Sequence, residues 1–365
     1  MCFTDDKIVN TAEELKVASF FCSEDRGNTS LHKDVTFYSF PFPGLCVVTV
    51  VCILLFVVGI VGNIMTILII SKSRNMRTTT NLYLSSIALS DVLILLCMPL
   101  DLYKMWNFRP WRLGDMVCKL SQYVSEACTY STVLHITALS MERYLAVCYP
   151  LQVKVIITRT KIKWLIVMLW AVALSSAGPV FVLVGVEFEN GTDPAETGEC
   201  KCTSYAVTSG LLNIMMWVSS LYFFVPVCCL SLLYSLIGKK LWRRRRRHRN
   251  RSNTQTVKML AVIVLAFVLC WLPFHVGRNL LSIASGTSEM YVVAEYFSLL
   301  SCVLFYLSAA INPVLYNTMS ARYRASVCRM LRIRHCRTMS RHREWCTVSS
   351  WHQSVNNRQR QHIEL

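Results

Sequence analysis

Charged residues are scarce in this chain of 365 residues, and their scarcity is the first feature that restricts the fold. Asp, Glu, Lys and Arg together make up 16% of the sequence, whereas hydrophobic residues make up 54%. Soluble globular domains carry about 25% charged residues, so an ordinary water-soluble fold of this length is excluded. The surplus of apolar side chains predicts that a lipid bilayer supplies part of the solvent.

The first 40 residues lack the apolar run of a cleaved signal peptide. They carry acidic side chains among polar neighbours instead, at Asp5, Asp6, Glu13, Glu14, Glu24 and Asp25. A signal peptide needs roughly 7 to 15 apolar residues behind a basic start, and no such stretch lies near the first residue. We therefore expect residues 1–44 to form a polar tail outside the membrane.

Seven apolar stretches are long enough to cross a bilayer as helices, which requires about 20 mostly apolar residues each. They cover residues 45–70, 81–103, 116–148, 162–185, 206–238, 257–281 and 291–317. The third is the weakest by hydropathy, because Glu126, His135, Glu142 and Arg143 interrupt it. Prolines inside the spans predict kinks rather than ends, at Pro99, Pro179, Pro226, Pro273 and Pro313. The sequence thus predicts an all-α membrane protein, a seven-transmembrane-helix bundle covering residues 45–317.

Basic residues in the short loops predict how this bundle is oriented. The loops after the first, third and fifth spans are basic and contain no acidic residue, whereas the loop 186–204 has five acidic residues and one lysine. The positive-inside rule therefore places the amino terminus outside and the carboxyl terminus inside. The N-x-S/T sequons at Asn28 and Asn190 both fall on the outer side, so they agree with this orientation and are glycosylation candidates.

The formal net charge of +17 would suggest nucleic-acid binding in a soluble protein. The densest basic run, Arg243 to Arg247, lies directly between two spans, so we interpret it as a cytoplasmic cap that contacts anionic lipid or a partner protein. No nucleic-acid partner is expected. In the cytoplasmic segment 318–365, apolar residues at helical spacing between arginines predict a short amphipathic helix. Cys328 and Cys336 beside it are candidates for lipidation, with unmodified thiols as the alternative.

The chain has 17 cysteines, and many lie inside apolar runs, where a thiol packs as a small apolar group. Only the loop cysteines are disulfide candidates. Cys118 and Cys200 both face the outer, oxidising side, which permits a disulfide that would hold the acidic loop over a pocket mouth. Cys202 is a close competitor for this pairing, and Cys2 and Cys22 have no assigned partner.

Ionisable groups inside membrane spans are energetically expensive, so each one that remains is a candidate functional residue. Asp91 lies in the middle of the second span, with Asn63, Ser308 and Asn312 as plausible polar neighbours. This set would suit a small cation or a proton, and a hydrogen-bonded packing node is the alternative.

At the cytoplasmic end of the third span, Glu142-Arg143-Tyr144 places a carboxylate beside a guanidinium. The carboxylate can hold the arginine until another partner competes for it. As a bare tripeptide, however, this run carries no meaning on its own.

Glu126 and Arg278 form a second candidate pair, in the outer half of the bundle. Glu126 lies about 12 Å further into the membrane than Cys118, at 1.5 Å per residue, and Arg278 is placed at similar depth on the sixth span. Opposite charges that face a cavity would anchor a polar ligand, and a purely structural ion pair is the alternative. Aromatic and His side chains could line the same cavity or simply pack there: Trp271, Phe274, His275, Phe305 and Tyr306.

Several motifs occur in the same order as in a known family. They are Gly62-Asn63, Leu84 to Asp91, Glu142-Arg143-Tyr144, Trp170, Pro226, Cys270-Trp271-Leu272-Pro273 and Asn312-Pro313-Val314-Leu315-Tyr316. With these motifs the chain resembles the rhodopsin-like G-protein-coupled receptors over all its spans. Shorter runs, including Met76 to Leu84 and Trp271 to Arg278, resemble the ghrelin (growth hormone secretagogue) and motilin receptor group. Within this group the outer loop is more similar to the ghrelin branch, and spans three to five are more similar to the motilin branch.

The resemblance implies roles for individual residues. Asp91 would be an allosteric sodium site, Arg143 the cytoplasmic latch, Trp271 the hinge below the agonist and Tyr316 a packing switch. The remaining switch residues would be Glu142, Tyr144, Pro273, Asn312 and Pro313. The peptide pocket would be lined by Asp101, Gln122, Glu126, Phe274, Arg278 and Phe305. One departure is Cys302, which stands where the ghrelin branch has an aromatic residue and so weakens the expectation that an acylated peptide is read in the same way.

The resemblance also implies partners. A motilin-like or ghrelin-like peptide hormone would bind outside, and a heterotrimeric G protein of the Gq type and arrestin would bind inside, at the plasma membrane. No cofactor is expected apart from the sodium ion. We favour motilin slightly, because of spans three to five, and a receptor for a different neuropeptide is the alternative.

Other membrane protein classes fit the sequence less well. Residues 291–317 contain no lysine, so the retinal linkage of an opsin is excluded. An intramembrane aspartyl protease needs two deep carboxylates, and only Asp91 is deep, so an enzyme is not expected. A transporter or channel is the remote alternative, and the sequence shows no internal repeat of the kind that transporters carry.

Overall fold

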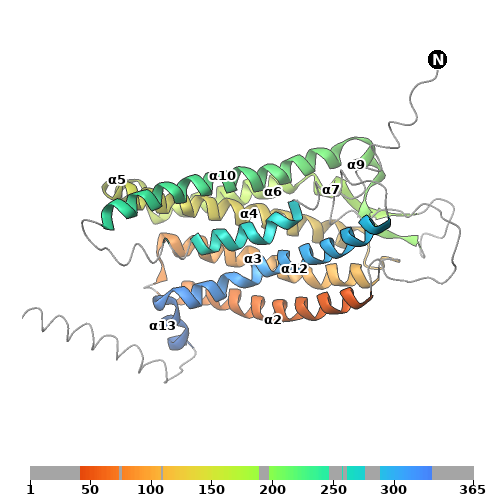
Figure 1. The fold of residues 1–365 in the computed structure, drawn as a ribbon, viewed down its shortest axis with the longest axis horizontal. Helices are drawn as coiled ribbons and strands as arrows, with labels where there is room; N and C mark the ends of the chain where they lie inside the picture. The colour runs from red at the N-terminus through yellow and green to blue at the C-terminus, as the bar shows by residue number, and fades with distance from the viewer. Residues whose placement is uncertain are drawn as a thin grey trace, which may run out of the picture.

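The computed structural model describes residues 42–73, 76–107, 110–188, 197–245, 257, 261–275 and 288–330. Long helices that run side by side make up most of this part of the chain (Figure 1). They are α2 (Phe42–Lys72), α3 (Thr79–Trp106), α4 (Asp115–Cys148), α6 (Arg159–Ala177), α10 (Leu211–Arg245), a helix over 261–275, and α12 (Ser288–Met319). The shorter elements are α5 (Pro150–Ile156), α7 (Val180–Leu183), β1 (Val184–Glu187), β2 (Glu199–Cys202), α9 (Ser204–Thr208) and α13 (Ala321–Met330).

Within the described residues, 5 helical segments are long and apolar enough to cross a membrane. They are Phe42–Lys72, Thr79–Trp106, Arg159–Leu183, Leu211–Lys240 and Tyr296–Thr318. The sixth predicted span is described only over Ala261–His275, which is a shorter apolar helix. The third predicted span, α4, is not among these segments, which agrees with its weak apolar signal in the sequence.

Helix α4 tolerates its polar side chains because it lies in the interior of the bundle, against α3, α6 and α10. His135, for example, is fully buried, yet Ser86 Oγ of α3 lies 3.1 Å from its Nε2 atom. The indole of Trp170 on α6 donates to the same hydroxyl at 2.8 Å. Buried polar groups in a bilayer need internal partners of this kind, so a polar central helix is stable where a lipid-facing one would not be.

Helix starts in this chain follow local capping signals. Thr78 accepts a hydrogen bond from the Asn81 amide at the start of α3, and Thr158 accepts one from the Lys161 amide at the start of α6. Both threonines satisfy an amide that has no partner within its own helix. Pro99, Pro226 and Pro313 lie inside α3, α10 and α12, as the sequence predicts.

Pro179 is a correction to the prediction of a kinked fourth span. Helix α6 ends at Ala177, and Pro179 precedes the short helix α7. A proline has no amide hydrogen to continue the ladder, and the Gly178 amide closes the last turn on the Ser175 carbonyl at 3.1 Å. The break therefore lies two residues before α7 begins, and the chain then passes directly into β1.

Close packing of α2 against its neighbours depends on two glycines. A Cβ atom at Gly59 would lie 2.5 Å from Leu95 Cδ1, and one at Gly62 would lie 2.8 Å from Pro313 Cβ. Small residues at such crossings let helix backbones approach in a membrane, where apolar burial alone does not drive association. Asn63 uses this proximity to donate to the Ala309 carbonyl on α12 at 2.9 Å.

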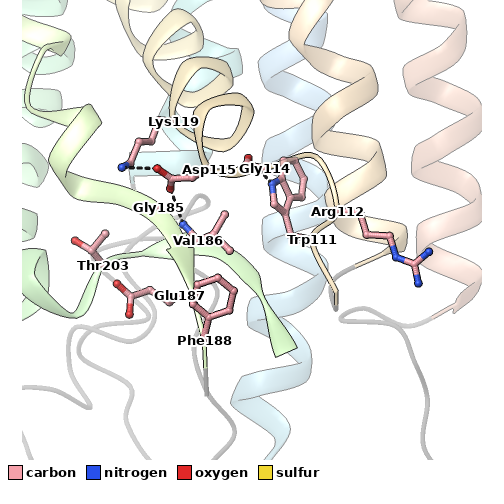
Figure 2. Close-up of a pocket in the computed structure, with 10 residues that line it drawn as sticks. All are labelled: Trp111, Arg112, Gly114, Asp115, Lys119, Gly185, Val186, Glu187, Phe188 and Thr203. Atoms are coloured by element: carbon pink, nitrogen blue, oxygen red, sulfur yellow. Dashed lines mark hydrogen bonds and ion pairs between the residues drawn. The ribbon is translucent and has the colours of Figure 1, made fainter. Parts of the chain in front are cut away.

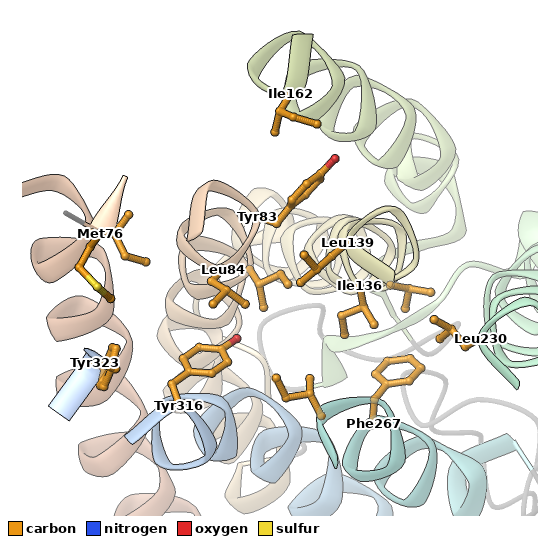
Figure 3. Close-up of a cluster of buried hydrophobic side chains, with 14 of the residues drawn as sticks. Met76, Tyr83, Leu84, Ile136, Leu139, Ile162, Leu230, Phe267, Tyr316 and Tyr323 are labelled. Atoms are coloured by element: carbon orange, nitrogen blue, oxygen red, sulfur yellow. The ribbon is translucent and has the colours of Figure 1, made fainter. Parts of the chain in front are cut away.

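The largest apolar cluster fills the half of the bundle near α13, where side chains from several helices converge (Figure 3). Its labelled members include Tyr83, Leu139, Leu230, Phe267 and Tyr316. Large apolar side chains on the outer faces of the helices, such as Val58 and Trp217, are instead exposed, as expected for lipid-facing positions.

Strands β1 and β2 form an antiparallel hairpin at the end of the bundle where α2 begins (Figure 1). The Cys118–Cys200 disulfide, with a Cα–Cα distance of 5.7 Å, ties β2 to the start of α4 and confirms the expected pairing. On the other strand, the Val186 amide donates to Asp115 Oδ1 at 3.0 Å. The hairpin is thus fixed to α4 through both of its strands.

Helix α13 lies at the opposite end of the bundle from the hairpin and confirms the predicted short helix after the last span (Figure 1). The Tyr323 hydroxyl lies 2.8 Å from Thr66 Oγ1, which fastens α13 to α2. Cys328 lies on α13 and is disulfide-bonded, while Cys336 falls outside the described residues. Acylation at Cys328 would first need a reduced thiol, and lipidation at either site remains a prediction.

Candidate ligand pocket and cytoplasmic latch

A small cavity lies between α4, α10, the helix over 261–275 and α12. Its volume is about 30 Å³, close to the volume of one water molecule. It is lined by Glu126, Thr129, Ser219, Cys270, Trp271, Phe274, Ser301 and Phe305. Three of the predicted pocket residues, Glu126, Phe274 and Phe305, therefore share one cavity. A ligand side chain that enters it would contact the aromatic walls formed by Trp271, Phe274 and Phe305.

The floor of this cavity is aromatic. The Trp271 ring meets Phe305 edge-on, with centroids 5.3 Å apart, and meets Phe274 edge-on at 6.1 Å. It also lies 6.0 Å from Phe267, which belongs to the apolar cluster deeper in the bundle. Edge-to-face pairs at these distances are favourable, and a shift of one ring changes the packing of the next. The position of Trp271 agrees with a hinge below a ligand.

Asp101 and Gln122, the other predicted pocket residues within the described chain, lie in a buried polar cluster beside Phe305. The Tyr306 hydroxyl donates to Asp101 Oδ2, and Gln122 Nε2 approaches Asp101 Oδ1 at 3.4 Å. Tyr306 follows Phe305 in α12, and the two rings are 4.9 Å apart, which joins the polar cluster to the cavity. The Gln122 carbonyl Oε1 is buried and has no hydrogen-bond partner among the described residues, so a donor from a ligand could occupy it.

Arg278, the proposed partner of Glu126, lies outside the described residues, as do Asn28, Asn190 and the side chains of Arg243 to Arg247. The Glu126–Arg278 pair therefore stays a prediction. Glu126 itself is half-buried on the cavity wall.

A second, wider cavity opens at the hairpin end of the molecule, with a volume of about 520 Å³ (Figure 2). It is lined by Trp111, Arg112, Gly114, Asp115, Lys119, Gly185, Val186, Glu187, Phe188 and Thr203. At its floor, Lys119 Nζ pairs with Asp115 Oδ2 at 2.6 Å. This ion pair is more than a quarter exposed on both sides, and the Lys119 ammonium holds the pKa of Asp115 below its ordinary value of 3.8.

Asp91 is 1% exposed and accepts a hydrogen bond from Asn312 Nδ2 at 2.9 Å, as predicted for this pair. Two other predicted neighbours behave differently. Asn63 donates to main-chain carbonyls of α2 and α12, and Ser308 donates to the Phe305 carbonyl. Their short side chains donate to main-chain carbonyls within reach instead of to Asp91. The sequence alone does not indicate this choice of acceptor. No basic side chain of the described residues pairs with Asp91.

Glu142 and Arg143, for which a latch is predicted, lie in contact at the end of α4. Arg143 Nη2 lies 2.5 Å from Glu142 Oε1, and the same guanidinium donates to Thr80 Oγ1 of α3. Thr79 holds the carboxylate from α3 as well, at 2.6 Å. Tyr144 packs its ring against Tyr149, with centroids 6.3 Å apart, on the loop side. The arginine is therefore tied between two helices at the end remote from the hairpin.

Sequence reasoning missed the small polar residues of both sites. Thr129 lies one helical turn after Glu126, Ser301 lies one turn before Phe305, and both line the small cavity. Helical spacing from the proposed pocket residues could have found them. Thr79 and Thr80 had no such signal, because the contact depends on how α3 is rotated against α4.

Comparisons with known proteins agree with this arrangement. Residues 62–316 match the family described as 7 transmembrane receptor (rhodopsin family). The chain is 60% identical to the growth hormone secretagogue receptor type 1 of Homo sapiens, over 84% of this chain and 86% of that protein. It is likewise 60% identical to the Sus scrofa receptor of the same name, over 80% of this chain and 82% of that protein. Identity to the Homo sapiens motilin receptor is 46%, over 83% of this chain and 85% of that protein.

Proposed function

Because this chain belongs to the rhodopsin family of 7 transmembrane receptors, we propose that it is a G-protein-coupled receptor for a peptide hormone of the growth hormone secretagogue (ghrelin) and motilin type. The observation that carries the proposal is the 60% identity to the growth hormone secretagogue receptor type 1 over 84% of the chain. Identity to the motilin receptor is lower, at 46%. We therefore place a ghrelin-type peptide first and a motilin-type peptide second, which reverses the order that spans three to five suggested.

The two cavities support a binding mode for such a peptide. The wide cavity at the hairpin end can receive one part of the peptide, and the small cavity beside Trp271 can receive one side chain. Glu126 offers a carboxylate to a basic group, and Phe274 and Phe305 offer aromatic surface to an apolar one. The small cavity holds only about 30 Å³, so a side chain that enters must move Trp271 or Phe305.

This displacement is the proposed link between agonist and G protein. Trp271 packs on Phe267, and Phe267 belongs to the apolar cluster that extends toward the latch. An agonist that binds better to the displaced packing shifts the population toward it, by no more than its difference in affinity for the two packings. In that packing, outward movement of the helix over 261–275 would open a site beside Arg143 for the G protein.

The finer assignments extend this proposal. The G protein is of the Gq type and raises intracellular calcium, and arrestin binds the same cytoplasmic end. The receptor spans the plasma membrane with its amino terminus outside, as the basic loops and the sequons at Asn28 and Asn190 indicate. Anionic lipid would contact the basic residues of the cytoplasmic loops and of α13.

A sodium ion at Asp91 is part of the proposal. The Asp91 carboxylate is buried, carries one hydrogen bond from Asn312, and pairs with no basic side chain within the described chain. A buried carboxylate in this setting must either bind a cation or take up a proton, so the residues present fit a small monovalent cation. The ion would stabilise the packing in which Asp91 keeps its charge.

The decisive experiment is a dose-response panel of ghrelin-type and motilin-type peptides on cells that display the receptor, with calcium as the readout. We expect one of the two peptides to raise calcium, and guanine-nucleotide exchange on a co-expressed Gq protein to follow the same potency. Silence toward both peptides, with receptor confirmed at the surface, would contradict the assignment. A response to another neuropeptide, or an ion flux without nucleotide exchange, would support the alternatives.

A further inference from the structure

Helices α2 and α12 lie in close contact along much of their length. At one point, a Cβ atom at Gly44 would lie 3.1 Å from Leu299 Cδ1, and further along, one at Gly59 would lie 3.2 Å from Ala310 Cα. The residue numbers rise together from the first contact to the second, so the two helices run in the same direction. Small residues at both points let the two backbones approach closely.

Two cysteines face each other between these points of contact. Cys52 lies seven residues before Gly59 on α2, and Cys302 lies eight residues before Ala310 on α12. Residues at these spacings lie on the same face of a helix, two turns apart. Both side chains are fully buried in the same apolar cluster, and both are free thiols. The two thiols are hydrogen-bonded to each other, so each helix presents its sulfur directly to the other.

The surroundings of this pair favour a disulfide over a metal ion as its second state. Within the described part of the chain, no group of three or more His, Cys, Asp or Glu side chains is placed to hold a metal ion. Two thiolates around a monovalent soft cation would leave a net negative charge, which is costly in a buried site. A disulfide carries no charge. Cys97, another buried thiol of the bundle, is hydrogen-bonded to Ser125 and has no comparable thiol partner.

The pair lies at the depth of the lipid acyl chains. Cys52 is ten residues from Phe42, which is about 15 Å along the helix at 1.5 Å per residue, and the hydrocarbon core is about 30 Å thick. The next two residues, Ile53 and Leu54, are exposed on the lipid-facing side of α2. Helix α2 packs mainly against α3, α12 and α13, at the edge of the bundle. A local separation of α2 from α12 therefore admits a molecule dissolved in the lipid.

We propose that Cys52 and Cys302 form a redox-sensitive dithiol site that organic hydroperoxides in the bilayer oxidise to a disulfide. The sulfur of one cysteine attacks the terminal oxygen of the hydroperoxide, the oxygen–oxygen bond breaks, and the thiol proton passes to the departing oxygen. This step yields a sulfenic acid and a lipid alcohol. The second thiol then displaces the sulfenic oxygen as water, and the sulfur–sulfur bond forms. The two thiols lose two electrons, which the hydroperoxide takes up.

The disulfide would fix α12 to α2 beside the small cavity. Ser301 and Phe305 line that cavity, and they lie next to Cys302 and one turn after it. A disulfide keeps its two Cα atoms within about 6.8 Å, so α12 could no longer move away from α2 at this point. The bond would hold Phe305 in place and oppose its displacement by an agonist. This consequence rests on the proposed function, whereas the disulfide itself does not.

The test uses the full-length receptor in lipid nanodiscs, with cumene hydroperoxide as the probe. After treatment, the remaining thiols are blocked with N-ethylmaleimide in denaturant, and the digested protein is analysed by mass spectrometry. We expect a linked peptide pair that contains Cys52 and Cys302, lighter by the two hydrogen atoms lost and separated by dithiothreitol. The exposed cysteines Cys228 and Cys229 report, through their own oxidation, that the probe has reached the membrane interior.

Serine variants identify the linkage. Cys52→Ser and Cys302→Ser should each lose the linked pair, whereas Cys97→Ser, the matched buried control, should keep it. Cys302→Ala takes the place of Cys302→Ser if the serine variant fails to fold. The proposal is wrong if Cys228 is oxidised while Cys52 and Cys302 are both recovered as maleimide adducts, or if either one is linked to another cysteine.

The consequence for signalling is measured in cells that display the receptor. Hydroperoxide should lower the peptide-evoked calcium response of the wild type more than that of Cys52→Ser, which cannot form the bond. An equal loss in both would exclude the disulfide as the cause. Absence of any calcium response before treatment would contradict the proposed function, and the linked peptide would still report on the dithiol site.

Discussion

At the scale of single residues, Glu126 has the sharpest expected effect. It supplies the one carboxyl group among the described residues that line the small cavity. Glu126→Gln removes the charge and keeps the shape, so a ligand cation would lose its partner while the wall remains packed. We expect agonist potency to fall by an order of magnitude or more, which corresponds to about 1.4 kcal/mol or more of binding free energy. Surface ELISA and agonist dose-response on the same cells measure both quantities.

Glu187→Gln provides a comparison at the wide cavity. Glu187 lies on β1 and lines that cavity, and its carboxylate accepts hydrogen bonds from the Ser204 amide and hydroxyl at 3.3 and 3.1 Å, outside the small cavity. The same substitution should therefore lower potency less than Glu126→Gln does. Unchanged potency of Glu126→Gln at normal surface expression would exclude Glu126 from the ligand site. Reduced expression with unchanged potency would show instead that its ion pair is structural, because breaking a buried pair destabilises the fold.

The side-chain contacts that the sequence predicted correctly are those whose partner is local or fixed by strong chemistry. Glu142 and Arg143 are adjacent in the sequence. A buried carboxylate such as Asp91 requires a polar partner, and Asn312 donates to it. The loop cysteines at 118 and 200 could pair only outside the membrane. The partners of Asp101 were less visible. Tyr306 reaches Asp101 only because α12 presents that face to α3, and the rotation of a helix between neighbours is set by packing and not by its own periodicity.

Among the elements, α13 is joined to α2 by a buried hydrogen bond as well as by apolar packing. The Tyr323 hydroxyl lies 2.8 Å from Thr66 Oγ1, and Thr66 also donates to the Gly62 carbonyl of its own helix. Tyr323→Phe removes the bond between the helices and keeps the ring. We expect the free energy of unfolding to fall by about 1 kcal/mol, the usual net value of such a bond. Thermal unfolding of the purified receptor in detergent measures this loss.

Tyr316 provides a matched comparison, since its ring lies 6.3 Å from that of Tyr323 at the junction of α12 and α13. Its hydroxyl is buried and has no hydrogen-bond partner among the described residues. Tyr316→Phe should therefore leave the thermal stability unchanged or raise it, because it removes an unsatisfied polar group. A larger loss of stability in Tyr316→Phe than in Tyr323→Phe would contradict both assignments.

The Asp115 carboxylate joins the start of α4 to strand β1. Asp115 pairs with Lys119 at 2.6 Å and accepts the Val186 amide, and the Lys119 ammonium lowers the Asp115 pKa below 3.8. A carboxyl whose pKa is lower in the folded state stabilises the fold above its unfolded pKa, and the contribution is lost as the pH falls through the folded value. The pair is well exposed, so the effect is small and is screened by salt.

Asp115→Asn keeps an oxygen for the Val186 amide and removes only the charge. At low ionic strength, we expect the variant to unfold at a slightly lower temperature than wild type near neutral pH. This difference should hold down to about pH 4 and shrink as the pH falls below 3.8. The same substitution in a Lys119→Met background should show a smaller pH-dependent difference, because only the Val186 amide then still lowers the pKa of Asp115. If the difference in unfolding temperature between Asp115→Asn and wild type grew as the pH fell, its pH dependence would have the opposite sign. The ion pair would then be excluded as its cause.

The elements themselves were mostly predictable, and the two exceptions have physical reasons. Long apolar runs identified the spans because lipid imposes their length and composition. Helix α4 gave a weak signal because it faces protein on most sides, and Pro179 ended a helix instead of bending it because the chain turns there into a hairpin. The burial of α4 and the path of the chain from α6 into β1 both depend on neighbouring elements. Neither can therefore be predicted from the local sequence alone.

Across the whole molecule, ring contacts connect the small cavity with the apolar cluster that extends to the latch. Phe305 meets Trp271 at 5.3 Å, Trp271 meets Phe267 at 6.0 Å, and Phe267 meets Phe223 on α10 at 6.2 Å. At the remote end, the Arg143 Nε atom and the Tyr316 hydroxyl are buried without a hydrogen-bond partner among the described residues. Buried polar groups without partners raise the free energy of this helix packing. A second helix packing in which both groups gain hydrogen bonds would remove that cost.

If two packings of this kind exist, ligand and G protein must affect each other reciprocally. A G protein that raises agonist affinity by some factor is itself bound more tightly by the same factor when agonist is present, typically about 5- to 150-fold. We expect this factor to appear when agonist affinity is measured in lipid nanodiscs with and without excess nucleotide-free G protein. Arg143→Ala should bring the factor close to one and abolish nucleotide exchange, because it removes the residue that the G protein would release from Glu142 and Thr80.

Two variants separate this coupling from simple loss of binding or folding. Glu126→Gln should lower agonist affinity by a similar factor with and without G protein, so that the ratio of the two affinities survives. Arg77→Ala removes an exposed arginine near the same end, which donates to the Ser71 carbonyl, and should preserve both exchange and the ratio. If Arg143→Ala kept the full affinity ratio at normal surface expression, the latch would not be part of the switch. The coupling would then have to run through the helices without Arg143, because reciprocity between the two sites holds whichever residues transmit it.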